Sequence, residues 1–245
     1  MGRSHQDRAD AGTGARRWPW VPCLGAGMTL LLVSSCGFAQ PDIDPITLVP
    51  LSRIEIPPVQ GKTAVIDIMV VDQATHRLFV ADGFDKGIDV VDLSTVPGRY
   101  VTTIPLKAIP KGLVIAPDLK RLYSGNDDST VSVINIDPAS ASVNQVIDSV
   151  STQGTGTADL IEYDQRDHRV FVTNPDPDDG FITAIDVPTD KVHGKITGLN
   201  HVDQPRFDAH DGMLYVGATD DNLILRIDPA TDTVVAKAQI PVTCA

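Results

Sequence analysis

The chain has 245 residues, of which 42% are hydrophobic, and this is enough to bury a substantial core. Its formal net charge is −12, and it contains no basic run. Because nucleic-acid binding relies on Lys and Arg that neutralise phosphates, this charge argues against a nucleic-acid partner. The three cysteines, Cys23, Cys36 and Cys244, form no CxxC pattern, which argues against a disulfide framework or a haem site.

The first part of the chain, residues 1–39, has the pattern of a secretory signal peptide. Two arginines precede an apolar stretch that is short for a transmembrane helix, and small residues follow it. Cleavage after Ala39 fits ordinary signal peptidase, whereas the segment ending in Cys36 resembles a lipoprotein box in which this cysteine is lipidated. Both alternatives predict an exported protein, periplasmic or extracellular, and only the second attaches it to a membrane, through a lipid anchor on Cys36. Residues 40–50, with three prolines, are predicted to be a linker.

Residues 51–57 have the character of an outer β-strand and stand before a repeated unit. The repeat is anchored by an aromatic residue in four similar strands, Phe79, Tyr123, Phe171 and Tyr215, at spacings of 44, 48 and 44 residues. A polar turn precedes each anchor, and strands that alternate apolar and polar residues follow it. A period in the forties is typical of a four-stranded antiparallel sheet that stacks on its neighbours. The sequence therefore predicts an all-β fold with units at 58–106, 107–152, 153–199 and 200–245.

The third unit carries the most recognisable motifs. Residues 170–174 read VFVTN, and residues 185–192 read IDVPTDKV. On these motifs the chain resembles the YVTN-type β-propeller repeat family over roughly residues 51–245. The resemblance implies four-stranded blades arranged in a propeller, usually of about seven blades. Four units and an additional N-terminal strand then suggest that this chain is part of a larger ring.

Polar residues recur twelve positions before each aromatic anchor. These residues are Asp67, Lys111, Asp159 and Asp203, and each is predicted to stand where an inner strand begins. Inner strands line the channel of a propeller, so the four side chains are candidate ligand-binding residues at the channel mouth. Three carboxylates at this position predict binding of a cation or a cationic ligand. The alternative is that these side chains only cap solvated strand ends.

A second candidate is the acidic segment that contains Asn174, Asp176 and Asp178. Calcium prefers several carboxylate and carbonyl ligands on one loop, so this segment is a possible calcium site. Its spacing departs from the calcium-loop pattern, because Ile185 stands at the position of the bidentate acid. An acidic hairpin turn is the alternative, and no other cofactor is predicted.

The sequence contains no catalytic motif, neither a G-x-S-x-G elbow nor a phosphate-binding loop nor an HExxH pair. The leading hypothesis is a non-catalytic binding or scaffold propeller whose partner is a small molecule or a protein. A lactonase-like hydrolase with a metal at the channel mouth is the second hypothesis. A periplasmic redox partner is the third, although no CxxCH or copper ligand set supports it.

Overall fold

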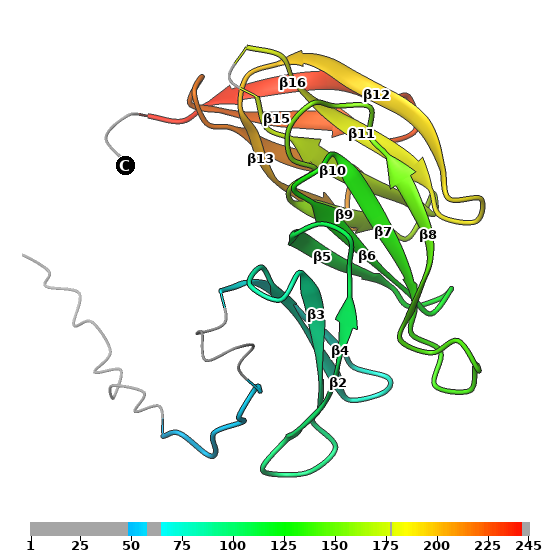
Figure 1. The fold of residues 1–245 in the computed structure, drawn as a ribbon. Coiled ribbons are helices and arrows are strands. Elements are labelled where there is room, and N and C mark those ends of the chain that lie inside the picture. The colour runs from blue at the N-terminus through cyan, green and yellow to red at the C-terminus, as the bar shows by residue number, and fades with distance from the viewer. Residues whose placement is uncertain (1–48, 58–64, 177, 242–245) are drawn as a thin grey trace, which may run out of the picture. The chain divides into compact units, whose positions relative to one another are not determined.

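The computed structural model describes residues 49–57, 65–176 and 178–241. The predicted leader with Cys36, the linker up to residue 48, and Cys244 lie outside the described residues. The described part of the chain is all-β, as predicted: it contains four antiparallel four-stranded sheets and no helix (Figure 1). None of its elements is a helix long and apolar enough to cross a membrane.

Each sheet is a meander of four strands that are consecutive in the sequence, and one sheet falls in each of the four predicted units. Sheet 1 contains β1 (Ile66–Asp72), β2 (Arg77–Asp82), β3 (Gly87–Asp92) and β4 (Arg99–Pro105). Sheet 2 contains β5 (Pro110–Ala116), β6 (Arg121–Asn126), β7 (Thr130–Asn135) and β8 (Gln145–Ser151). Sheet 3 contains β9 (Ile161–Asp164), β10 (Arg169–Asn174), β11 (Gly180–Asp186) and β12 (Lys191–Leu199). Sheet 4 contains β13 (Val202–Asp208), β14 (Met213–Ala218), β15 (Leu223–Asp228) and β16 (Thr233–Gln239).

The polar turns before the anchor strands reverse the chain within a few residues. The last turn residue has a left-handed backbone in every sheet, at His76, Lys120, His168 and Gly212, with φ between 51° and 70°. In sheets 1 and 3 the aspartate that opens the turn accepts a hydrogen bond from the backbone N–H two residues later. Such turns favour Asp and tolerate few other side chains, which explains why the turns repeat with the period of the sheets.

The aromatic anchors fill the spaces between the sheets. Phe79, Tyr123 and Phe171 have no exposed surface, and each packs toward the sheet that follows its own. Three apolar cores result, one at each junction between consecutive sheets. A single four-stranded sheet cannot bury both of its faces, so this stacking supplies the burial that stabilises the fold.

Residues 51–57 form no strand, although an outer strand was predicted there. A strand needs the edge of a neighbouring sheet to satisfy its backbone groups, and no strand of the described part of the chain pairs with this segment. The side chain of Ile54 instead approaches Gly98, in the connection between β3 and β4.

Candidate functional site

The first strands of the four sheets lie next to one another, β1 beside β5, β5 beside β9 and β9 beside β13. The four predicted residues occupy the same point in this row. Asp67 is in β1, Lys111 is in β5, Asp203 is in β13, and Asp159 stands two residues before β9. In sheets 1, 2 and 4 this point coincides with an irregularity in the pairing of the first strand. Bulges of this kind re-aim side chains and recur beside binding sites.

The backbone around Asp159 approaches sheet 2 closely. The Gly112 N–H donates a hydrogen bond to the Asp159 carbonyl oxygen at 3.2 Å. A Cβ atom added at either Gly112 or Gly125 would lie 2.4 Å from that same oxygen. Only glycine allows this approach at both positions, so the two glycines fix where Asp159 stands relative to sheet 2.

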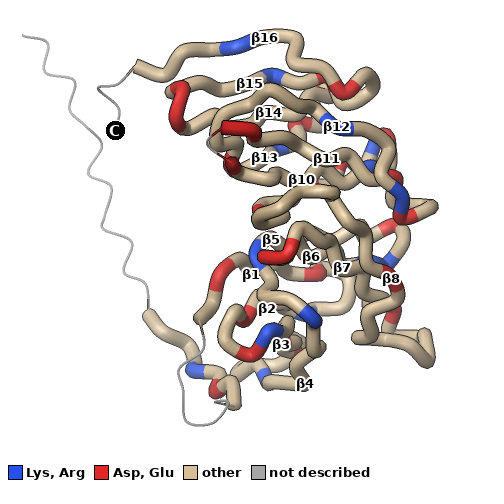
Figure 2. The backbone as a smooth tube through the Cα atoms, turned by 45° about the horizontal axis from the view of Figure 1, so that its top comes forward, with Lys and Arg blue, Asp and Glu red and all other residues tan. Residues whose placement is uncertain are grey.

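The four residues share one electrostatic environment. Burial raises the pKa of the Asp159 carboxyl above its ordinary value, and the Asp67 and Asp203 carboxylates raise it further. The positive charges of Lys111 and His201 act in the opposite direction. In Figure 2 acidic and basic segments meet beside β5. The structure therefore brings together residues from all four sheets, in an arrangement where negative charge is crowded.

A cavity of about 250 Å³ follows directly after these residues along the inner strands. Its apolar lining comes from the first strands of sheets 1 and 2 and from the start of sheet 3; it includes Ile68, Val70, Leu113, Val114, Leu160 and Ile161. The polar lining consists of Glu162, Gln204 and Arg206. A cavity that combines apolar side chains with a few polar groups is the usual construction of a small-ligand site.

Glu162 and Arg206 were not predicted as site residues. Arg206 Nη1 lies 3.2 Å from Glu162 Oε2 and joins sheets 3 and 4 across the cavity. Burial raises the pKa of Glu162, and the Arg206 charge partly offsets this effect. Both residues stand nine positions before their aromatic anchors, where sheets 1 and 2 carry Val70 and Val114. Asp159 was identified by counting twelve positions back from an anchor. Counting nine positions back would therefore have identified Glu162 and Arg206.

The calcium candidate is arranged as a turn. Asn174 is buried, and its amide nitrogen donates to Thr152 Oγ1 and to the Thr157 carbonyl, both at 2.9 Å. Asp176 Oδ1 accepts the backbone N–H groups of Asp178 and Asp179 and so closes the hairpin. Among residues 49–57, 65–176 and 178–241, no group of three His, Cys, Asp or Glu side chains could hold a metal ion.

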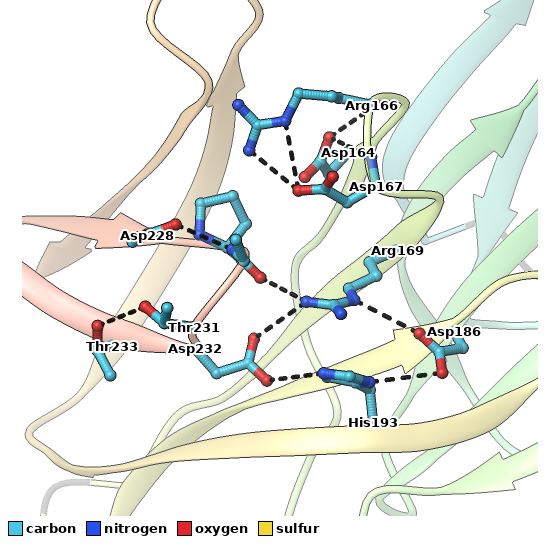
Figure 3. A network of polar contacts seen from close by, with 12 residues as sticks. Asp164, Arg166, Asp167, Arg169, Asp186, His193, Asp228, Thr231, Asp232 and Thr233 are labelled. Atoms are coloured by element: carbon cyan, nitrogen blue, oxygen red, sulfur yellow. Dashed lines mark hydrogen bonds and ion pairs between the residues drawn. The ribbon is translucent and has the colours of Figure 1, made fainter.

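The junctions between sheets carry a second set of polar contacts, which the sequence had not indicated. Figure 3 shows the one between sheets 3 and 4, where Arg169 lies between Asp186 and Asp232. His193 bridges the same two aspartates, with its ring nitrogens 3.5 Å from Asp186 and 3.7 Å from Asp232. These contacts lie away from the inner strands and join neighbouring sheets through their hairpins.

Comparisons with known proteins add to the description of the fold. No protein-family model and no curated protein sequence matches the chain. Among solved structures, a chain of hydrazine synthase from Kuenenia stuttgartiensis matches with a TM-score of 0.59 and 18% identity, over 75% of this chain and 53% of that one. A chain of the mitotic checkpoint complex matches with a TM-score of 0.59 and 15% identity, over 72% of this chain and 51% of that one.

This chain therefore spans about half the length of the solved chains it matches. The two neighbours are β-propeller-like proteins. At these identities the likeness concerns the fold alone and carries no information on ligands or activity.

Proposed function

We propose that the four sheets are blades of an exported β-propeller of the YVTN-repeat type, and that this propeller is a non-catalytic binding module. Three observations support the propeller: the repeated anchors, the stacking of four-stranded meanders, and the fold of the structural neighbours. The leader pattern supports export. A ring of about seven blades stays a prediction.

The ligand that fits the inner strands best is an organic cation with an apolar body. The observation that carries this proposal is the placement of Asp159, which is half-buried, directly before the cavity-lining residues Leu160 and Ile161 and within electrostatic reach of the Asp67 and Asp203 carboxylates. A positive group at this point relieves the repulsion among the three carboxylates. The apolar part of the ligand would lie along the walls formed by the first strands, where it gains burial.

The test compares hexylamine with hexanoate, which have similar chains and opposite charge, by isothermal titration at low ionic strength. We expect the protein to bind hexylamine in preference to hexanoate, and we expect Asp159→Asn to weaken hexylamine binding at least tenfold. Asp148→Asn removes an exposed carboxylate from β8 and serves as the matched control, with unchanged binding. Equal binding of the two probes, or unchanged affinity in Asp159→Asn, would contradict the proposal.

A further inference from the structure

A second cavity lies at the junction between sheets 1 and 2. It has a volume of about 340 Å³ and is formed by residues 105–108, which lead from β4 to β5, by the β6–β7 hairpin and by β8. Most of its exposed wall is apolar, and its apolar side chains are Pro105, Leu106, Ala108 and Val146. A molecule of liquid water takes about 30 Å³, so the cavity has space for an organic molecule of about ten heavy atoms.

The buried polar side chains of this cavity are uncharged. Asn126 and Ser132 are 1% and 7% exposed, and the Asn126 amide donates to Ser132 Oγ at 3.0 Å. The charged side chains that line the cavity, Lys107 and Asp128, are exposed and opposite in sign. A charged ligand would lose its hydration without gaining a buried partner of opposite charge, so the lining favours an uncharged ligand.

Two hydrogen-bond donors of the lining lack an acceptor among the described residues. The Ser132 hydroxyl accepts from Asn126 but donates to none of these residues. The backbone N–H of Ala108, a residue that is 6% exposed, donates to none of them either. A buried donor without an acceptor is costly, so an acceptor oxygen of a ligand is favoured here.

The junction between sheets 2 and 3 shows what the chain itself places at the corresponding position. Thr152 follows the last strand of sheet 2 as Leu106 follows that of sheet 1, and the connection after Thr152 is longer. Asn174 ends the second strand of its sheet, as Asn126 does, and its amide donates to Thr152 Oγ1 and to the Thr157 carbonyl, both at 2.9 Å. A hydroxyl and a peptide carbonyl of the chain therefore meet the buried amide at this junction.

The junction between sheets 3 and 4 has apolar residues at the corresponding positions. Ala218 ends its strand where Asn126 ends β6, and Leu225 is the third residue of its strand, as Ser132 is in β7. Both are buried in the apolar core of that junction. One junction thus closes with apolar side chains and another with a peptide segment, whereas the junction between sheets 1 and 2 keeps buried polar side chains beside an open cavity.

We propose that this cavity binds a small uncharged amide with an aliphatic body. The carbonyl oxygen of the amide accepts from the donors that Ser132 and Ala108 offer, in the role that the Thr157 carbonyl has at the next junction. The aliphatic body packs on Leu106 and Val146. The site is separate from the inner-strand cavity, because none of the described residues lines both.

The experiment follows backbone amide shifts by NMR during a titration with N-butylacetamide, and hexanoate, which has a similar length, is the charged reference. We expect saturable shifts in residues 105–108, 126–132 and 146–149 with N-butylacetamide and none there with hexanoate. Val146 is 41% exposed, so Val146→Trp should fill the cavity from its surface without disturbing the core, and it should abolish binding. Ile147→Trp adds the same ring at the next residue of β8, which does not line the cavity, and should leave binding unchanged.

Ser132→Ala removes one donor and should weaken the binding of N-butylacetamide about fivefold, as the loss of one hydrogen bond does. The proposal is overturned if the shifts do not saturate, which would mean that the cavity holds water only, or if hexanoate reproduces them. It is also overturned if N-butylacetamide binds Val146→Trp or Ser132→Ala as tightly as it binds the unmodified protein. Unchanged shifts in sheets 3 and 4 show that each variant is folded.

Discussion

The junction between sheets 2 and 3 and the junction between sheets 1 and 2 bury equivalent aromatic residues, Tyr123 and Phe79, yet they treat the arginine beside the aromatic differently. Arg121 reaches a carboxylate and a carbonyl of the next sheet, whereas Arg77 Nη1 is buried without a partner. The apolar part of a junction and its polar part are therefore separable. The apolar part follows the period of the repeat, and the polar part depends on the loop residue opposite the arginine and on whether the anchor carries a hydroxyl.

The third junction, between sheets 3 and 4, stands between these two. Its aspartate is present, but the anchor is Phe171, which lacks the hydroxyl that Tyr123 donates to Asp190. Asp232 accordingly lies 4.0 Å from its arginine, and its Oδ1 has no hydrogen-bond partner. The third junction lacks only the anchor hydroxyl, whereas the first lacks both the hydroxyl and the carboxylate.

The largest expected effect tests whether the apolar cores of the first and third junctions contribute equally to stability. Phe79→Ala and Phe171→Ala each remove a fully buried ring, and each should lower the free energy of unfolding by about 3–5 kcal/mol. Urea unfolding of the two variants measures this. Similar losses would confirm that the difference between the junctions is polar. A loss at Phe79 less than half of that at Phe171 would show instead that the first junction is packed less well.

The next largest effect is the difference in stability between the Arg121→Met and Arg77→Met variants. Arg121→Met leaves Asp190, whose side chain is only 10% exposed, without its charged donor, and it should cost about 2 kcal/mol. Arg77→Met removes no side-chain hydrogen bond to the described residues, so the free energy of unfolding should change by less than about 0.5 kcal/mol or increase. Urea unfolding of both variants checks the contrast.

The double variant Arg121→Met with Asp190→Asn is the control for this contrast. It removes the charge that the single variant leaves unpaired, so it should recover part of the loss. If Arg77→Met costs as much as Arg121→Met, the unpaired state of Arg77 is not what distinguishes the two junctions.

The repeat could be predicted because sheets 1, 2 and 3 bury the same aromatic position and sheet 4 keeps an aromatic residue there. The aromatic anchors lie in β2, β6, β10 and β14, and the polar turns before them recur because each needs a left-handed backbone. The same periodicity placed Asp159 beside Asp67 and Asp203, since the first strands adjoin one another. Whether these residues bind a ligand stays a prediction.

Contacts between sheets were harder to predict. Arg121 and Asp190 are 69 residues apart, and the loop that carries the aspartate differs in length from sheet to sheet. In sheet 2 that loop is longer, and the residue that ends it with a left-handed backbone is Asn144, which no regular spacing would identify. The Glu162–Arg206 pair was missed for a related reason, because each residue alone interrupts an apolar position of its own strand.

The smallest effect concerns the pH dependence of the third junction. Burial raises the pKa of Asp232 above its ordinary value of 3.8, and His193 and Arg169 offset this only in part. Because the folded pKa is raised, the stability that Asp232 contributes is present below 3.8 and is lost as the pH rises through the folded pKa. We expect the unfolding free energy of the protein, relative to that of Asp232→Asn, to fall over this window and then to level off.

Urea unfolding of both proteins from acidic to neutral pH measures the difference. His193→Gln should move the fall to higher pH, because His193 lowers the pKa of Asp232. A difference that is flat, or that increases with pH, would mean that the charges of His193 and Arg169 offset the burial of Asp232 completely.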